Sequence, residues 1–169
     1  GLRALGHQPI FQGTWFYDRE VDLEALNQFN ENLAQTLVGR LIDTSPLPFG
    51  RHRWVALDRV PTIDVERAPR SRSEVGDWLE EVSLRPVDPE HGPGWRFGVL
   101  PLTDGGTAVT LLIPHALGDG LCKLQAIADA VAGRSRGPRY PKRLNGGRTR
   151  RFFADLWSSM REMPVLGKA

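Results

Sequence analysis

Residues 110–121 read TLLIPHALGDGL, an apolar run that leads into one histidine and then into an aspartate between two glycines. The apolar run is typical of a buried strand, because it consists largely of β-branched and aliphatic residues. The two glycines mark a turn, and the apolar residues that follow recur at helical spacing. The sequence therefore predicts a strand, a tight loop and a helix in direct succession, with His115 at the exit of the strand.

This loop carries side chains suited to proton transfer. Histidine titrates nearest neutral pH of all side chains, so His115 can take up and return a proton. Gly118 and Gly120 leave room for backbone or substrate to approach closely. If the helix begins at Gly120, Asp119 is placed to cap the free amides of its first turn and so to hold the loop in shape.

The segment His115-Ala116-Leu117-Gly118-Asp119-Gly120 resembles the second histidine and the remainder of the HHxxxDG motif of the chloramphenicol-acetyltransferase-like superfamily. That superfamily includes peptide-synthetase condensation domains, polyketide-associated acyltransferases and wax ester synthase/diacylglycerol acyltransferases. The sequence pattern of the wax ester synthases is the most similar. In the same order as in that family, the motif is preceded by Gly94-Trp95-Arg96-Phe97, a hairpin turn and the apolar run 108–113. Pro114 stands where the family has its first histidine.

The resemblance implies an acyltransferase in which His115 is the general base. An acyl thioester, on CoA or on the phosphopantetheine of a carrier protein, would donate the acyl group to an alcohol or an amine. O-acyl transfer of the wax ester or diacylglycerol type is favoured, and no cofactor is bound permanently. Asp119, Gly118, Gly120 and Pro114 would shape the site, with Asp119 held against an arginine. The rival hypothesis, which Pro114 favours, is an inactive lobe that serves as a binding or docking module.

The resemblance also implies two similar lobes with the histidine loop at their interface. The chain is identified on this basis as an N-terminal lobe over residues 1–133, followed by a linker over 134–151 and an amphipathic helix over 152–169 that crosses toward a C-terminal lobe. That second lobe is expected on another chain or on a cleaved part of the same chain. The apolar face of the helix consists of Phe153, Leu156, Trp157 and Met160, for which core packing is favoured over association with a membrane surface.

Residues 134–151 hold eight Arg or Lys and no acidic residue, whereas the whole chain has a net charge of only +2. A solvated linker rich in Gly and Pro is the favoured interpretation. The alternative is an electrostatic landing site for the diphosphate of CoA or phosphopantetheine, for an acidic carrier protein or for anionic lipid. Nucleic acid is not expected as a partner, because only Tyr140 is interleaved with the basic residues.

Composition limits the remaining possibilities. The 169 residues are 40% hydrophobic and 25% charged, which suffices for one globular domain with a core. No window resembles a membrane span or a secretory signal, so a cytoplasmic location is predicted, with peripheral contact at the inner face of a membrane as an alternative. His7, His52 and His91 lack the spacing of metal ligands, so no metal site is predicted. For Cys122, close packing is favoured over catalysis.

The rest of the chain predicts an irregular alternation of strands and helices. A helix is expected to begin after Asp22 and to continue at apolar spacing as far as Leu41, and a second begins at a capping box formed by Ser71 and Glu74. The helix after Asp119 carries an apolar stripe of Leu121, Leu124, Ala128 and Val131, and Gly133 suits its C′ position. Strands are predicted over 10–17, 53–57, 63–65, 95–102 and 107–113, the last two forming a hairpin. The pattern is that of an α/β or α+β two-layer sandwich with a mixed sheet and flanking helices, which agrees with one lobe of a CoA-dependent acyltransferase-like fold.

Overall fold

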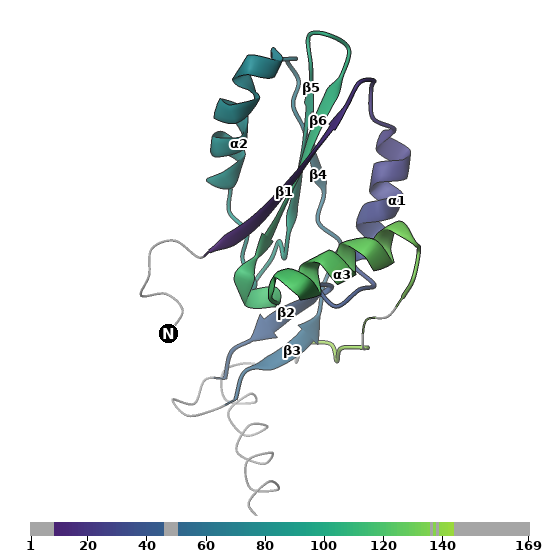
Figure 1. Cartoon of the computed structure of the whole chain (residues 1–169). Helices are drawn as coiled ribbons and strands as arrows, with labels where there is room; N and C mark the ends of the chain where they lie inside the picture. The colour runs from purple at the N-terminus through teal and green to yellow at the C-terminus, as the bar shows by residue number, and fades with distance from the viewer. Residues whose placement is uncertain (1–8, 46–50, 136, 138, 144–169) are drawn as a thin grey trace, which may run out of the picture.

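The computed structural model describes residues 9–45, 51–135, 137 and 139–143. Strands and helices alternate irregularly, and the hairpin before His115 forms as the sequence predicts (Figure 1). The elements in chain order are β1 (Ile10–Tyr17), α1 (Leu23–Leu33), β2 (Arg40–Asp43), β3 (Arg53–Ala56), β4 (Ile63–Val65), the 3₁₀ turn η2 (Arg72–Glu74), α2 (Val75–Ser83), β5 (Arg96–Pro101), β6 (Thr107–Pro114), the 3₁₀ turn η3 (His115–Leu117) and α3 (Gly120–Val131).

The main sheet has four strands in the order β1-β6-β5-β4. β6 lies inside the sheet, antiparallel to both β1 and β5, and all eight of its residues are buried. β4 runs parallel to β5, which makes the sheet mixed. β2 and β3 form a separate antiparallel pair. A strand that is paired on both edges and covered on both faces is a rigid support for the histidine that follows it.

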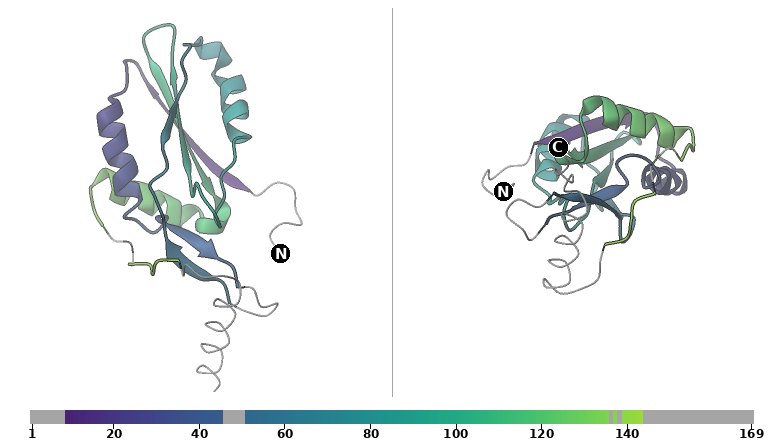
Figure 2. Two further views of the ribbon diagram at one scale, coloured as in Figure 1. Left: turned by 180° about the vertical axis from the view of Figure 1, so that it is seen from behind. Right: turned by 90° about the horizontal axis from the view of Figure 1, so that it is seen from below.

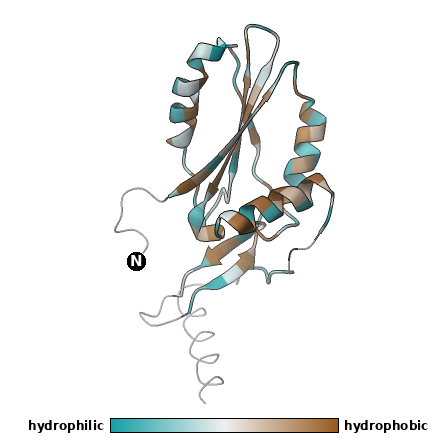
Figure 3. Cartoon of the chain, in the orientation of Figure 1, coloured by the Kyte–Doolittle hydropathy of each residue, from teal (hydrophilic) through white to brown (hydrophobic). Residues whose placement is uncertain are grey.

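Helices cover both faces of the main sheet (Figure 2). Trp78 and Val82 of α2 pack with Leu112 of β6 on one face. On the other face, Leu33 of α1 and Ala126 of α3 belong to a core cluster with the alternate β6 residues, such as Leu111. Figure 3 shows that the strands are largely hydrophobic, whereas the helices carry hydrophilic residues as well. The mixed sheet with flanking helices is confirmed, and the sheet is the middle layer of three where two layers were expected.

Helix α1 begins where the sequence predicts and ends early. The Asp22 carboxylate caps it by accepting hydrogen bonds from the backbone amides of Glu24 and Ala25. The predicted continuation to Leu41 is wrong, because the helix stops at Leu33 and β2 has begun by Arg40. The chain turns back so tightly at Gly39 that a Cβ there would lie 1.9 Å from the carbonyl oxygen of Ala34. Leu41 is therefore a buried strand residue and not part of a helical stripe.

Helix α3 also differs from the sequence prediction in which face it buries. The predicted apolar stripe is exposed, with relative exposures of 77% for Leu121, 58% for Leu124 and 74% for Val131. Lys123 and Ala126 lie instead on the buried face. The helix ends as predicted, with Gly133 at a φ of +62° in the C′ position.

Part of the basic segment 134–151 is described, and it lies against β2 and β3. Tyr140 accepts a hydrogen bond from Arg40, and Arg143 donates to the backbone carbonyls of Ile42 and Glu90. The rest of that segment and the predicted amphipathic helix over 152–169 lie outside the described residues, as does His7. Among the helices that are described, none has the length and apolar character needed to cross a bilayer.

Candidate functional site

His115 is the first residue after the buried strand β6, and its side chain is exposed. Its backbone amide donates a 2.9 Å hydrogen bond to the carbonyl of Pro9, and Pro114 beside it pairs with Ile10 of β1. Pro114 is itself buried and ends β6. The imidazole is thus carried on a backbone that two neighbouring strands fix in place.

An arginine holds the far end of the histidine loop. Arg40 of β2 donates a 2.8 Å hydrogen bond from Nη2 to the carbonyl oxygen of Leu117. Its guanidinium is fixed in turn by the Trp54 ring, 3.7 Å from the guanidinium carbon, and by a 3.0 Å hydrogen bond to the Tyr140 hydroxyl. The resemblance led us to expect an arginine against Asp119, and the structure instead places Arg40 on a loop carbonyl.

Asp119 caps α3 in the way that the sequence predicts. Its Oδ1 accepts a 2.8 Å hydrogen bond from the backbone amide of Cys122, and its own backbone is extended, as at other helix N-caps. Among the residues that the structure describes, no arginine forms an ion pair with it. The carboxylate therefore stabilises the start of the helix and, through it, the loop.

The two glycines beside Asp119 differ in their surroundings. A Cβ on Gly118 would lie 2.7 Å from the sulfur of Cys122, which is closer than real Cβ atoms approach. A Cβ on Gly120 would meet nothing within 4 Å. Close packing within the loop thus requires a glycine at 118, whereas nothing in the described chain requires one at 120.

Lys123 lies beneath the histidine, and it is the residue of the site that the sequence analysis missed. Its side chain is fully buried (0% exposed), with Nζ 3.4 Å from His115 Nδ1 and also hydrogen-bonded to the carbonyl oxygen of Gly118. Burial lowers the pKa of Lys123 and outweighs the opposing electrostatic effect of Cys122 and Asp119. The sequence signal is partial: Ala126 and Ala130 share the buried helical face with Lys123, but their small size does not by itself tell which face of the helix meets the sheet.

The other predicted candidates lie apart from this loop. His91 is exposed and pairs with Asp88 at 3.1 Å, and His52 is exposed and immediately precedes β3. Cys122 is a free thiol, partly buried next to Gly118. Within the described part of the chain, no group of three or more His, Cys, Asp or Glu side chains is arranged to hold a metal ion.

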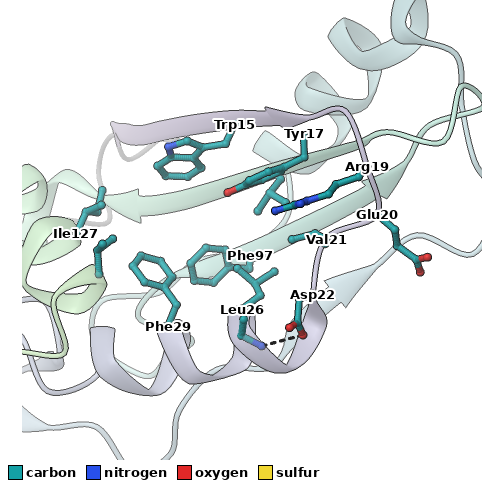
Figure 4. A pocket seen from close by; sticks show the side chains of 13 residues that line it. Trp15, Tyr17, Arg19, Glu20, Val21, Asp22, Leu26, Phe29, Phe97 and Ile127 are labelled. Carbon is teal, nitrogen blue, oxygen red and sulfur yellow. Dashed lines mark hydrogen bonds between the residues drawn. The ribbon is translucent and has the colours of Figure 1, made fainter.

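A cavity of about 540 Å³ lies between the sheet and helices α1 and α3 (Figure 4). The side chains of Trp15, Phe29 and Phe97 point into it, and Ile127 of α3 closes one side. None of residues 114–120 lines this cavity. It is therefore separate from the histidine loop.

No family model matches the sequence, and a search of curated proteins finds no match either. Several solved structures are similar in fold. SgcC5 of Streptomyces globisporus superposes with a TM-score of 0.59 at 17% identity. The starter condensation domain of rhizomide synthetase gives 0.58 at 9% identity. The X-domain from teicoplanin biosynthesis, for which a complex with OxyB has also been solved, gives 0.56 at 15% identity.

These superpositions cover 92%, 92% and 93% of this chain, in the same order. They cover only 36%, 39% and 36% of the matched chains, so this chain spans well under half of their length. At such identities the likeness establishes the fold alone. The chain has a condensation-domain-like fold, as the HxxxDG segment led us to expect.

Proposed function

We propose that this chain is the N-terminal, base-carrying lobe of an acyltransferase. The observation that supports the proposal is the placement of His115: an exposed imidazole on the end of a fully buried strand, inside an HxxxDG segment, in a condensation-domain-like fold. A general base must be exposed to its substrate and yet be held in one orientation, and this position meets both requirements. The rest of the loop is fixed by Arg40 and Asp119.

In the proposed reaction, Nε2 of His115 removes the proton from the hydroxyl or amine of the acceptor as its oxygen or nitrogen attacks the thioester carbonyl. The carbon–sulfur bond of the tetrahedral intermediate then breaks, and the imidazolium returns the same proton to the departing thiolate. The products are an ester or amide and a free thiol. The acyl group passes directly from donor to acceptor, so no residue of the chain becomes acylated.

Either of two thioesters would satisfy this chemistry, one on CoA and one on the phosphopantetheine arm of a carrier protein. Both present a phosphate group to the protein, and Arg139 and Lys142 of the basic segment are exposed and available to bind one. Arg143 is not available in the same way, because it is engaged by Asp43 and by two backbone carbonyls. An alcohol acceptor is favoured by the likeness of the motif to wax ester synthases.

The remaining part of such a fold would lie against this chain, on the same or another polypeptide. The exposed apolar face of α3, formed by Leu121, Leu124, Ala128 and Val131, is the surface that we expect it to cover. Exposed leucines and valines aligned along one helix are uncommon on a surface that faces only solvent. The open space at Gly120 lies at the start of the same helix and would leave room for substrate between the two parts.

Acyl transfer is tested by offering acyl-CoA thioesters, and the same acyl groups on a phosphopantetheinyl carrier protein, together with an alcohol or an amine. The chain is assayed alone and together with the polypeptide that supplies the rest of the fold. Mass spectrometry should find an acylated acceptor in amounts equal to the free thiol released. Absence of both products with every donor, in the presence of the complete fold, would contradict the proposal.

A docking module is the second candidate, and Pro114 is the observation that favours it. This buried proline occupies the position of the first motif histidine and cannot supply a polar side chain. The X-domain shares the fold and forms a complex with OxyB, so the fold is compatible with binding a protein partner. The same assay distinguishes the two candidates, because a docking module would release no thiol.

A further inference from the structure

Lys123 is a fully buried lysine for which the described residues provide no carboxylate partner. Its nearest acid in sequence, Asp119, uses its carboxylate to cap α3 at the amide of Cys122. Within the described part of the chain, the Nζ atom meets two polar atoms, Nδ1 of His115 and the carbonyl oxygen of Gly118. A buried ammonium without a counter-charge is costly, so such a lysine tends to lose its proton.

The charge on Lys123 decides which tautomer His115 adopts. An ammonium has no lone pair and can only donate, so a charged Lys123 would require a bare Nδ1 and therefore a proton on Nε2 of the neutral ring. A neutral imidazole protonated on Nε2 cannot accept a further proton there. An uncharged amine has two N–H groups and one lone pair, so it can donate to Gly118 and accept the Nδ1 proton of His115 at the same time.

We propose that Lys123 is a positioning residue, an uncharged amine that accepts the Nδ1–H of His115 and donates to the Gly118 carbonyl, so that Nε2 of His115 presents its lone pair to the substrate. The inference rests on the proposed function only in assigning a use to that lone pair. The tautomer itself is a property of this chain and is measurable without any substrate.

Among the described residues, the groups that face Lys123 from neighbouring elements are two rings, and neither is a carboxylate that could balance a buried ammonium. From η3 it meets the His115 ring, and from β1 the Phe11 ring, whose centroid is 6.0 Å away at the limit of a cation–π contact. Asp119 and Cys122, on its own helix, are the groups that favour the charged form, and neither forms a hydrogen bond with Nζ. Burial opposes them and holds the pKa of Lys123 below its ordinary value.

Nitrogen-15 NMR of the imidazole side chains tests the proposal on the intact 169-residue chain. At about pH 8, where histidines are mostly neutral, the protonated and bare ring nitrogens resonate at well-separated shifts. The His115 signals are assigned by their loss in His115→Ala. The expected result is a protonated Nδ1 and a bare Nε2, which is the reverse of the tautomer that predominates in free histidine. A proton on Nε2 in the native chain would overturn the proposal, and this measurement requires no Lys123 variant.

Two substitutions separate positioning from structural support. Lys123→Arg keeps a side chain that can only donate, and Lys123→Met keeps the length without a polar atom. In both, His115 should revert to the Nε2–H tautomer, and acyl transfer should fall by about 100-fold or more with KM nearly unchanged. Arg67→Met, at an exposed cationic residue outside both the site and the basic segment, is the control and should change neither. A native tautomer retained in Lys123→Arg would contradict the proposal.

The proposed function and the inference about Lys123 can fail separately. If the native chain carries its proton on Nδ1 of His115 but the complete fold transfers no acyl group, the proposed function is contradicted and the inference about Lys123 stands.

Discussion

Asp119 stabilises the histidine loop through a single hydrogen bond to the backbone of the next helix, and this makes its contribution measurable. Asp119→Ala removes the acceptor for the Cys122 amide and should lower the free energy of unfolding by about 1 kcal/mol. Asp119→Asn retains a side-chain oxygen at the same position and should remain within a few tenths of a kcal/mol of the native chain. Urea denaturation of the three proteins gives the comparison. Equal loss in both variants would show that Asp119 acts through its charge rather than through the cap.

Gly118 and Gly120 allow a paired test of whether close packing requires a glycine at each position. Gly118→Ala places a methyl group 2.7 Å from the Cys122 sulfur and should destabilise the chain by about 1–3 kcal/mol. Gly120→Ala meets nothing within 4 Å and, being in a helix, should leave stability equal or slightly raised. Thermal unfolding measures both. Adding Cys122→Ala to Gly118→Ala should recover part of the loss, and no recovery would show that the strain lies elsewhere.

Residues whose roles depend on local backbone geometry could be predicted from the sequence. The cap at Asp119 and the capping box of Ser71 and Glu74 follow from hydrogen bonds within three residues, and both are confirmed. Lys123 could not be identified in this way, because its contact with His115 depends on which face of α3 packs on the sheet. A lysine in a helix is ordinarily a solvated residue.

At the scale of elements, helix α2 is linked to β4 and β5 by a cluster around Glu66. The Glu66 carboxylate accepts hydrogen bonds from Trp78 of α2 and from Arg85, which follows that helix. Burial opposes a low pKa for Glu66, but the hydrogen bonds from Arg85 and Trp78 and the charge of Arg85 outweigh it and lower the pKa. A carboxyl whose pKa is lowered on folding stabilises the native state above its unfolded pKa and loses that contribution as the pH falls through its folded pKa.

Glu66→Gln should therefore lower the free energy of unfolding by about 1 kcal/mol near neutral pH, and the difference from the native chain should shrink in acid. Urea denaturation at about pH 7 and about pH 3 measures the change. Glu80→Gln, at an exposed acid on α2, is the matched control and should have little effect at either pH. If the free energy of unfolding of Glu66→Gln lies below that of the native chain by the same amount at both pH values, the ionised carboxylate does not contribute to stability.

The errors in predicting elements have tertiary causes. The helical spacing from Leu23 to Leu41 continues past the true end of α1, but the close approach of Gly39 to Ala34 and the pairing of Leu41 with Val55 take precedence. The apolar stripe of α3 was recognised in the sequence, yet periodicity does not tell which of two apolar faces meets the sheet. Here the face with Ala126 packs inward and the face with Leu124 remains exposed.

At the scale of the whole molecule, the exposed face of α3 should be the surface that binds the rest of the fold. Leu124→Asp should leave the circular dichroism and unfolding of this chain nearly unchanged, because the side chain is 58% exposed. It should weaken association with the complementary polypeptide, measured by size-exclusion chromatography with light scattering. Leu84→Asp, at a still more exposed leucine (74%) at the end of α2, is the control and should bind normally. Equal association of both variants would place the interface elsewhere.

The most direct test of His115 as the general base is acyl transfer by His115→Ala in the complete fold, measured as thiol release and acylated product. His115→Ala should lose about 100- to 10,000-fold in transfer and keep an unfolding midpoint close to that of the native chain, because an exposed imidazole contributes little to the core. His52→Ala, at another exposed histidine, should retain native activity. Transfer by His115→Ala at more than a few per cent of the native rate would show that another group is the base.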